Sequence, residues 1–224
     1  MKLIIDESVA KRFPELIVPI RVFQEVIISK SHPDLERFKE EVYARIKGKY
    51  TIESLKDSPR VRAYRDFFWR IGIDPTKNRP SAEALIRRIL AEKPIPQINT
   101  LVDAYNLASA EVAIPMAAFD LDRLEGELVM RFAKNGEEFL GIGMSHPISL
   151  KGGEVVISDK KKLVAIYPYR DAEYSKVTET TKNVLLLVCG VPKIDIAALK
   201  DAADVATDYI LRFCDGVKST SKVK

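Results

Sequence analysis

The residues best suited to chemistry gather in one polar stretch, 169–183, which lies between two strongly apolar runs. A loop between two strands can present polar side chains over a rigid scaffold. Carboxylates there can orient a water molecule or bind a cation, and hydroxyl or amide groups can donate hydrogen bonds to an oxyanion. The candidate catalytic residues are Asp171, Glu173, Ser175, Thr178 and Asn183. The alternative is an exposed charged turn in which threonine and asparagine cap backbone groups.

The conventional catalytic and metal-binding patterns are missing from the sequence. The two histidines, His32 and His146, have no cysteine or second histidine beside them, so no zinc site is expected. Nucleophile-elbow, phosphate-loop and HExxH motifs are absent as well. Cys189 and Cys214 lie in apolar patterns and are expected to be buried thiols. We therefore expect neither a cofactor nor a metal, and a histidine-dependent reaction would have to rely on His146 alone.

The elements that must position this chemistry centre on residues 101–120. Apolar residues at helical spacing predict a helix that ends at Ile114-Pro115, because the residue before a proline is pushed out of the α region. A short apolar strand follows, and the small side chains of Ala117 and Ala118 leave room for a niche at this corner. An ordinary helix–strand junction is the alternative interpretation.

The same stretch resembles a known family, the B3/B4 domain of the phenylalanyl-tRNA synthetase β subunit. The residues that carry the resemblance, in order and spacing, are Asp103, Asn106, Pro115, Phe119 and Asp120. Similar segments continue along the chain, at 121–124, 129–137, 175–177 and 181–186. Other stretches resemble the free-standing B3/B4-domain proteins of microbes, which have no synthetase body: 65–68, 80–85 and 98–103.

The resemblance implies a domain that hydrolyses mischarged aminoacyl-tRNA. In the synthetase a histidine and a glutamate serve the pocket for tyrosine, and this sequence has Ala117 and Leu187 at those positions. The family's Gly-Gly-Glu run is replaced by Asp171-Ala172-Glu173. We therefore expect a less polar pocket and a small or aliphatic amino acid in place of tyrosine. The expected substrate-pocket residues are Asn106, Ala117, Ala118, Phe119 and Leu187.

Positive charge is concentrated in one part of the chain. The net charge of the 224 residues is +4, but residues 60–93 alone hold nine Lys or Arg against four Asp or Glu. A basic lobe beside a more neutral one is typical of proteins that contact phosphates. The expected tRNA-binding residues are Arg62, Arg65, Arg70, Arg87 and Arg88. An arginine-rich, solvated helical surface is the alternative.

The order of predicted elements indicates an α+β fold. Strands are expected within 1–28, three helices within 31–91, strands from 116 to 189 and a final helix from 195. We expect a mixed or antiparallel sheet that curls toward a barrel, with a helical lobe and a C-terminal helix. Residues 1–96 should form the N-terminal strands and basic lobe, and 97–217 the B3/B4-like segment, in one compact unit. The tail 218–224 is expected to be disordered.

The sequence therefore favours a free-standing aminoacyl-tRNA deacylase whose partner is the aminoacylated 3′ end of tRNA. The rival is a non-catalytic module on the same fold that binds tRNA or a free amino acid. Because the sequence has no long apolar run and no signal-peptide pattern, we expect a cytoplasmic protein without a membrane partner. The sequence does not indicate an oligomeric state.

Overall fold

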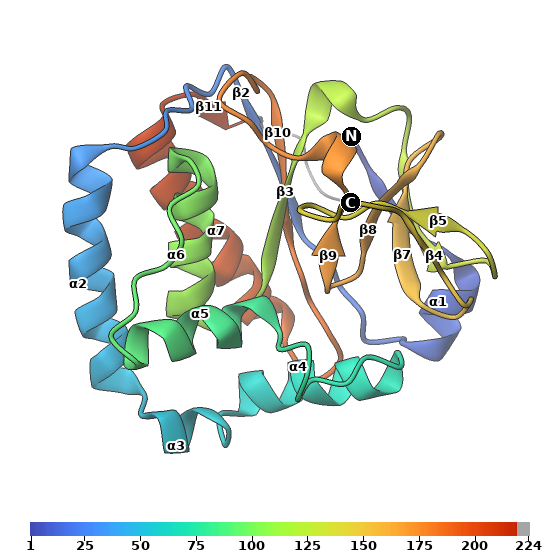
Figure 1. Cartoon of the computed structure of the whole chain (residues 1–224), viewed down its shortest axis with the longest axis horizontal. Coiled ribbons are helices and arrows are strands. Elements are labelled where there is room, and N and C mark those ends of the chain that lie inside the picture. The colour runs from blue at the N-terminus through green and yellow to red at the C-terminus, as the bar shows by residue number, and fades with distance from the viewer. Residues whose placement is uncertain (219–224) are drawn as a thin grey trace.

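The computed structural model describes residues 1–218 and contains two open β-sheets with helices packed around them (Figure 1). The predicted α+β class, with a mixed sheet, a helical lobe and a C-terminal helix, is confirmed. The sheets are not closed into a barrel within the described chain. Most of the predicted tail, 219–224, lies outside the described residues; Lys218 pairs with Phe23.

The five-stranded sheet forms one wall of the cavity that is described in the next section. Its strands, in spatial order, are β1 (Leu3–Ile5), β4 (Leu128–Phe132), β7 (Val155–Ser158), β8 (Leu163–Ile166) and β9 (Arg170–Asp171). β1 runs parallel to β4, and the other pairs are antiparallel. A separate hairpin of β5 (Glu138–Phe139) and β6 (Ile148–Ser149) lies beside this sheet.

The four-stranded sheet carries the opposite wall. Its antiparallel strands follow the order β11 (Val217–Lys218), β2 (Ile20–Gln24), β10 (Val184–Val188) and β3 (Met116–Asp120). In the β3–β10 pair, Ala117 lies opposite Leu187 and Phe119 opposite Leu185. Successive side chains of a strand point to opposite faces. The register therefore puts Ala117, Phe119 and Leu187 on one face and Ala118 on the other.

Seven α-helices complete the described part of the chain. They are α1 (Glu7–Arg12), α2 (Pro33–Lys49), α3 (Ile52–Leu55), α4 (Pro59–Arg70), α5 (Ser81–Leu90), α6 (Thr100–Val112) and α7 (Ile196–Cys214), with short 3₁₀ turns η1 (Leu121–Arg123) and η2 (Glu173–Ser175). The Asn99 side chain caps α6 by accepting a hydrogen bond from the Val102 backbone, and Ala113, in the left-handed conformation, ends the helix. This αL residue turns the chain directly into β3.

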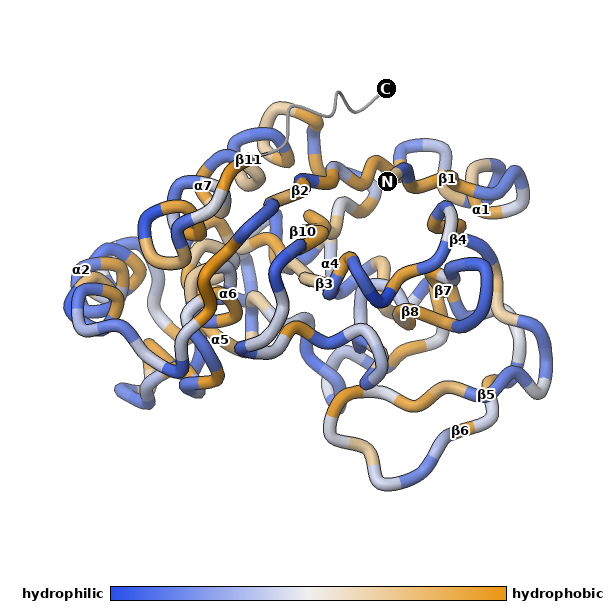
Figure 2. Tube along the Cα trace, turned by 90° about the horizontal axis from the view of Figure 1, so that it is seen from above, coloured by the Kyte–Doolittle hydropathy of each residue, from blue (hydrophilic) through white to orange (hydrophobic). Residues whose placement is uncertain are grey.

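The two sheets lie on either side of the site. Helices α6 and α7 pack on the face of the four-stranded sheet that points away from β7 and β8 (Figures 1 and 2). One hydrophobic core runs through both predicted segments, from Val9 to Cys214. A smaller cluster lies under the β5–β6 hairpin, which forms an arm at the edge of the molecule (Figure 2).

Candidate functional site

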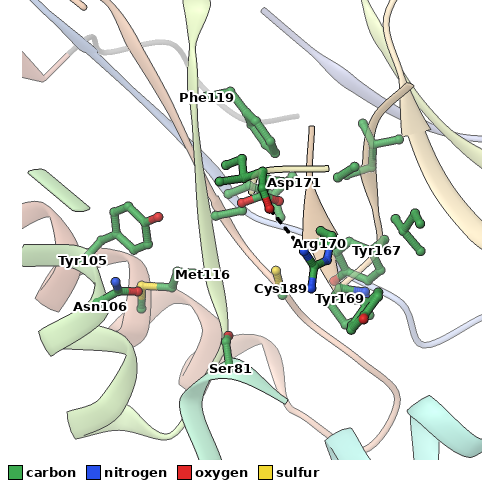
Figure 3. A pocket seen from close by; sticks show the side chains of 17 residues that line it. Ser81, Tyr105, Asn106, Met116, Phe119, Tyr167, Tyr169, Arg170, Asp171 and Cys189 are labelled. Carbon is green, nitrogen blue, oxygen red and sulfur yellow. Dashed lines mark hydrogen bonds between the residues drawn. The ribbon is translucent and has the colours of Figure 1, made fainter. Parts of the chain in front are cut away.

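A cavity of about 260 Å³ lies between the two sheets (Figure 3). Ala117 and Phe119 of β3 and Leu187 of β10 form one wall, and Ile157 of β7 and Ala165 of β8 lie among the residues of the other. All five side chains are buried. These strand residues form an apolar surface, and its part at Ala117, Phe119 and Leu187 is called the apolar floor of the cavity. Such a surface suits a small hydrophobic group of a ligand.

Asp171 places a carboxylate in this apolar cavity. β9 pairs with β8 at Ala165, and the backbone of Asp171 accepts a hydrogen bond from the Ile142 amide at 2.9 Å. Within residues 1–218, neither a hydrogen bond nor an ion pair reaches the side-chain carboxylate. Burial raises the pKa of Asp171 from 3.8 to about 7, because the charged form is poorly solvated. A carboxylate in this state can act as a base, bind a cation or accept a proton near neutral pH.

Polar groups from the helices form another part of the cavity lining. Tyr105 and Asn106 of α6 and Ser81, the first residue of α5, line the cavity. In the described chain, neither the Tyr105 hydroxyl nor the Asn106 amide makes a side-chain hydrogen bond. The pKa of Tyr105 is raised, mainly by burial and secondly by the nearby Asp171 carboxylate, so its phenol stays neutral. Helices α5 and α6 thus offer neutral hydrogen-bonding groups to a ligand.

Within residues 1–218, Arg170 makes no ion pair with its neighbour Asp171, although both line the cavity. Its guanidinium donates a hydrogen bond to the Ile142 carbonyl at 3.1 Å and lies 5.4 Å from the centre of the Tyr169 ring. Gly141 lies against it, and a Cβ at that glycine would come within 2.4 Å of the arginine side chain. The loop after β5 is therefore fitted to Arg170, and Ile142 closes part of the cavity.

The end of β10 is held by two tyrosines. The Tyr64 hydroxyl donates to the Cys189 carbonyl at 2.6 Å, and the Tyr167 hydroxyl donates to the Gly190 carbonyl. A Cβ at Gly190 would meet the Ile17 carbonyl oxygen at 1.9 Å, so only glycine fits there. The Cys189 thiol lines the cavity, and burial raises its pKa well above 9. It therefore remains a thiol and is a poor nucleophile.

The structure separates the other candidate catalytic residues from the cavity. Glu173 lines a second cavity and pairs with Lys176. Ser175 is fully buried in η2, where its hydroxyl has no partner among residues 1–218. The remaining two make local contacts, Thr178 with Thr180 and Thr181, and Asn183 with Asp122. Of the five candidate catalytic residues, Asp171 is thus the one that joins Asn106, Ala117, Phe119 and Leu187 in the cavity lining.

The expected phosphate-binding arginines differ in their surroundings. Arg65 and Arg87 both bond to the buried Glu83, at 2.7 and 2.8 Å. Burial opposes ionisation of Glu83, but the hydrogen bonds from these two arginines lower its pKa below 4.5. The exposed members make weaker or local contacts: Arg62 with Asp57, Arg70 with the Arg12 carbonyl and the Phe13 ring, and Arg88 with the Pro94 carbonyl.

Sequence reasoning did not identify several lining residues. Three of them could have been identified from their place in the sequence: Tyr105 is adjacent to Asn106, and Tyr169 and Arg170 belong to the polar stretch. Ser81 and Ile142 come from elements distant in the sequence, and no sequence pattern related them to the site. His146 is exposed in the loop between β5 and β6, outside the cavity lining.

Residues 1–218 contain no group of three or more His, Cys, Asp or Glu side chains arranged to hold a metal ion. No helix in that part of the protein has both the length and the apolar composition needed to span a bilayer.

The chain belongs to the B3/4 domain family, whose model matches residues 63–223. Its relatives include the phenylalanine–tRNA ligase β subunit of Fusobacterium nucleatum, 32% identical over 178 residues, or 76% of this chain and 22% of that subunit. The β subunit of Thermotoga maritima is 27% identical over 222 residues, or 96% of this chain and 26% of that subunit. The chain thus spans about a quarter or less of these relatives.

A solved structure shares the fold. An N-terminal fragment of the phenylalanyl-tRNA synthetase β subunit from Pyrococcus horikoshii superposes with a TM-score of 0.51 at 12% identity. The match covers 97% of this chain and 50% of that fragment.

Proposed function

We propose that this protein is a free-standing deacylase that hydrolyses mischarged aminoacyl-tRNA in trans. The observation that carries the proposal is the Asp171 carboxylate, which has no partner within residues 1–218 and faces a small apolar cavity. At about 260 Å³, the cavity is somewhat smaller than the roughly 300–1,000 Å³ typical of pockets for drug-sized ligands. It suits the aminoacyl group of a charged tRNA. Membership of the B3/4 domain family supports the link to tRNA.

The reaction needs few groups, because an aminoacyl ester is already activated. Water adds to the ester carbonyl, the bond to the ribose oxygen breaks, and the proton lost by the water ends on that oxygen. Positioning of the ester and the water supplies much of the rate, and a hydrogen-bond donor stabilises the oxyanion. In this cavity Tyr105, Asn106 and Ser81 carry side-chain donors, and Asp171 is the acidic group that can contact substrate or water.

The lining favours an aliphatic over a tyrosyl substrate. Ala117 and Phe119 of β3 and Leu187 of β10 offer no polar partner at the apolar floor. A buried phenol hydroxyl without a partner costs about 1–3 kcal/mol. An aliphatic side chain fills the same space without this cost.

The tRNA body would bind the exposed arginines of the basic lobe. Arg62, Arg70 and Arg88 present charge at the surface, whereas Arg65 and Arg87 are largely neutralised by Glu83. Phosphate contacts of this kind give affinity that falls steeply with salt.

The experiment is a deacylation assay on a panel of mischarged tRNAs that carry alanine, valine, leucine, isoleucine or tyrosine. The proposal predicts faster deacylation of at least one aliphatic member than in buffer alone, with the tyrosyl member slower. If no member is hydrolysed but charged tRNA or free amino acid binds, the protein is a binding module. The absence of a catalytic histidine from the cavity is the observation that favours this second function.

A further inference from the structure

The cavity contains an acidic group whose counter-charge the protein does not supply. Asp171 is half-buried among apolar side chains. Arg170, the only cation that lines the cavity in the described chain, is hydrogen-bonded to the Ile142 carbonyl. Carboxylates removed from water are ordinarily paired or hydrogen-bonded, so an unpaired one in a cavity points to a cationic ligand group.

We propose that Asp171 binds the α-ammonium group of the amino acid, so that the site accepts aminoacyl groups with a free amine and rejects N-acylated ones. The choice of an aminoacyl ligand rests on the function proposed above. Selection by the amine is an addition to it, and it can be measured without any hydrolysis.

The chemistry of the other lining groups fits this orientation of the ligand. An amine at Asp171 leaves the side chain of the ligand to pack on the apolar floor of Ala117 and Leu187. The carbonyl then has the neutral donors of α6, Tyr105 and Asn106, within the same lining. Each polar group of an aminoacyl ester thereby has a matching group in the cavity, and its apolar part has the floor.

Acylation of the amine removes both the charge and the fit. An amide nitrogen is neutral, so Asp171 would remain unpaired while the ligand displaced water from the cavity. The added acyl group also has to lie between the nitrogen and Asp171, where the ammonium group would otherwise meet the carboxylate. A charge-assisted hydrogen bond corresponds to roughly 10–100-fold in affinity.

Binding should also depend on pH in a defined direction. The titratable groups that line the cavity are Asp171 and Arg170 on β9, Tyr105 on α6, Cys189 after β10, and the tyrosines 167 and 169 before β9. Burial keeps Tyr105 and Cys189 neutral, so Asp171 is the group that changes charge near pH 7. An ammonium ion binds the ionised carboxylate, so affinity should rise from pH 6 to about 7.5. It should fall again as the α-amine loses its proton, near pH 8.

The test is calorimetric titration of the protein with three small probes. Leucinamide carries the ammonium, N-acetyl-leucinamide has it blocked, and 4-methylpentanamide lacks it. The variants are Asp171→Asn, which keeps the shape of the side chain, and Glu179→Gln, which removes an exposed carboxylate of the same polar stretch as a matched control. Thermal melting of each variant verifies that it is folded.

We expect wild type and Glu179→Gln to bind leucinamide at least 10-fold more tightly than the other two probes, and Asp171→Asn to lose this preference. Equal binding of leucinamide and N-acetyl-leucinamide overturns the inference, as does unchanged leucinamide binding by Asp171→Asn or no saturable binding to wild type. Amine preference without deacylation would refute the deacylase alone. Equal deacylation of N-acetylated and free mischarged tRNA would refute the amine selection alone.

Discussion

Replacement of Asp171 by asparagine should stabilise the fold in a pH-dependent way. In the folded protein the pKa of this carboxyl is raised from 3.8 to about 7, because burial disfavours the charged form. The folded state then binds the proton more tightly than the unfolded state. The stabilising contribution is fully present below about pH 4 and is lost as the pH rises to about 7. Asparagine does not titrate, so the variant loses nothing over this range.

The magnitude follows from the size of the shift. One pKa unit corresponds to about 1.4 kcal/mol, so a rise of about three units sets an upper limit of about 4 kcal/mol. The side chain is only half-buried, and water screens part of the effect, so we expect about 2–3 kcal/mol.

Urea unfolding at pH 4.5 and pH 8 measures this difference directly. The stability of Asp171→Asn minus that of wild type should be larger at pH 8 than at pH 4.5, whereas Glu179→Gln should show no such trend. An Asp171→Asn difference that is equal at the two pH values, or smaller at pH 8, would mean that the carboxylate is well solvated or paired in the folded protein. The account of the cavity would then be refuted.

Three further changes probe the cavity wall and the basic lobe. Leu187→Ala should lower the free energy of unfolding by about 2–5 kcal/mol, because the side chain is fully buried in β10; denaturant titration showing less than about 1 kcal/mol would contradict the placement. Ala117→Leu should occupy part of the cavity floor and weaken leucinamide binding roughly 10-fold or more, and unchanged calorimetric affinity would show that the ligand binds elsewhere. Replacing Arg62, Arg70 and Arg88 with glutamine should flatten the salt dependence of tRNA binding, measured by filter binding, and an unaltered slope would exclude this surface.

Part of the site could be predicted from the sequence because it lies in contiguous segments. Asn106, Ala117 and Phe119 belong to one helix–strand corner, and the resemblance related them to Leu187. Strand pairing then brings Ala117 and Leu187 directly opposite each other. Ala118 belongs to the same stretch, but it does not line the cavity, because strand alternation turns its side chain to the helical face.

The polar stretch could not be resolved from its composition. After Asp171, the chain turns through η2, so Ser175 enters the core and Asn183 reaches Asp122. Which of several neighbouring polar residues faces a cavity depends on this path, and no periodicity in the sequence encodes it. The strands that contain Ile157 and Ala165 were expected from the sequence, but their position across the cavity from β3 and β10 was not.

The number of charged residues in the basic lobe did not show how many of its arginines are free to bind phosphate. Residues 60–93 carry an excess of positive charge, but two of the arginines are used to hold a buried glutamate between α4 and α5. Glu83 sits on the same helix as Arg87, one turn away, which the sequence does reveal. Its contact with Arg65 across the helices depends on tertiary packing and was not visible.

The most direct test of the central claim is single-turnover deacylation of an aliphatic mischarged tRNA by wild type, Asp171→Asn and Glu179→Gln. The account predicts that wild type and Glu179→Gln accelerate hydrolysis over buffer, and that Asp171→Asn is roughly 10–1000-fold slower, the range for a lost positioning contact. It also predicts that kcat/KM rises with pH around 7 in wild type, since Asp171 ionises there in the free protein. Hydrolysis by Asp171→Asn at the wild-type rate, with the same pH profile, would contradict it.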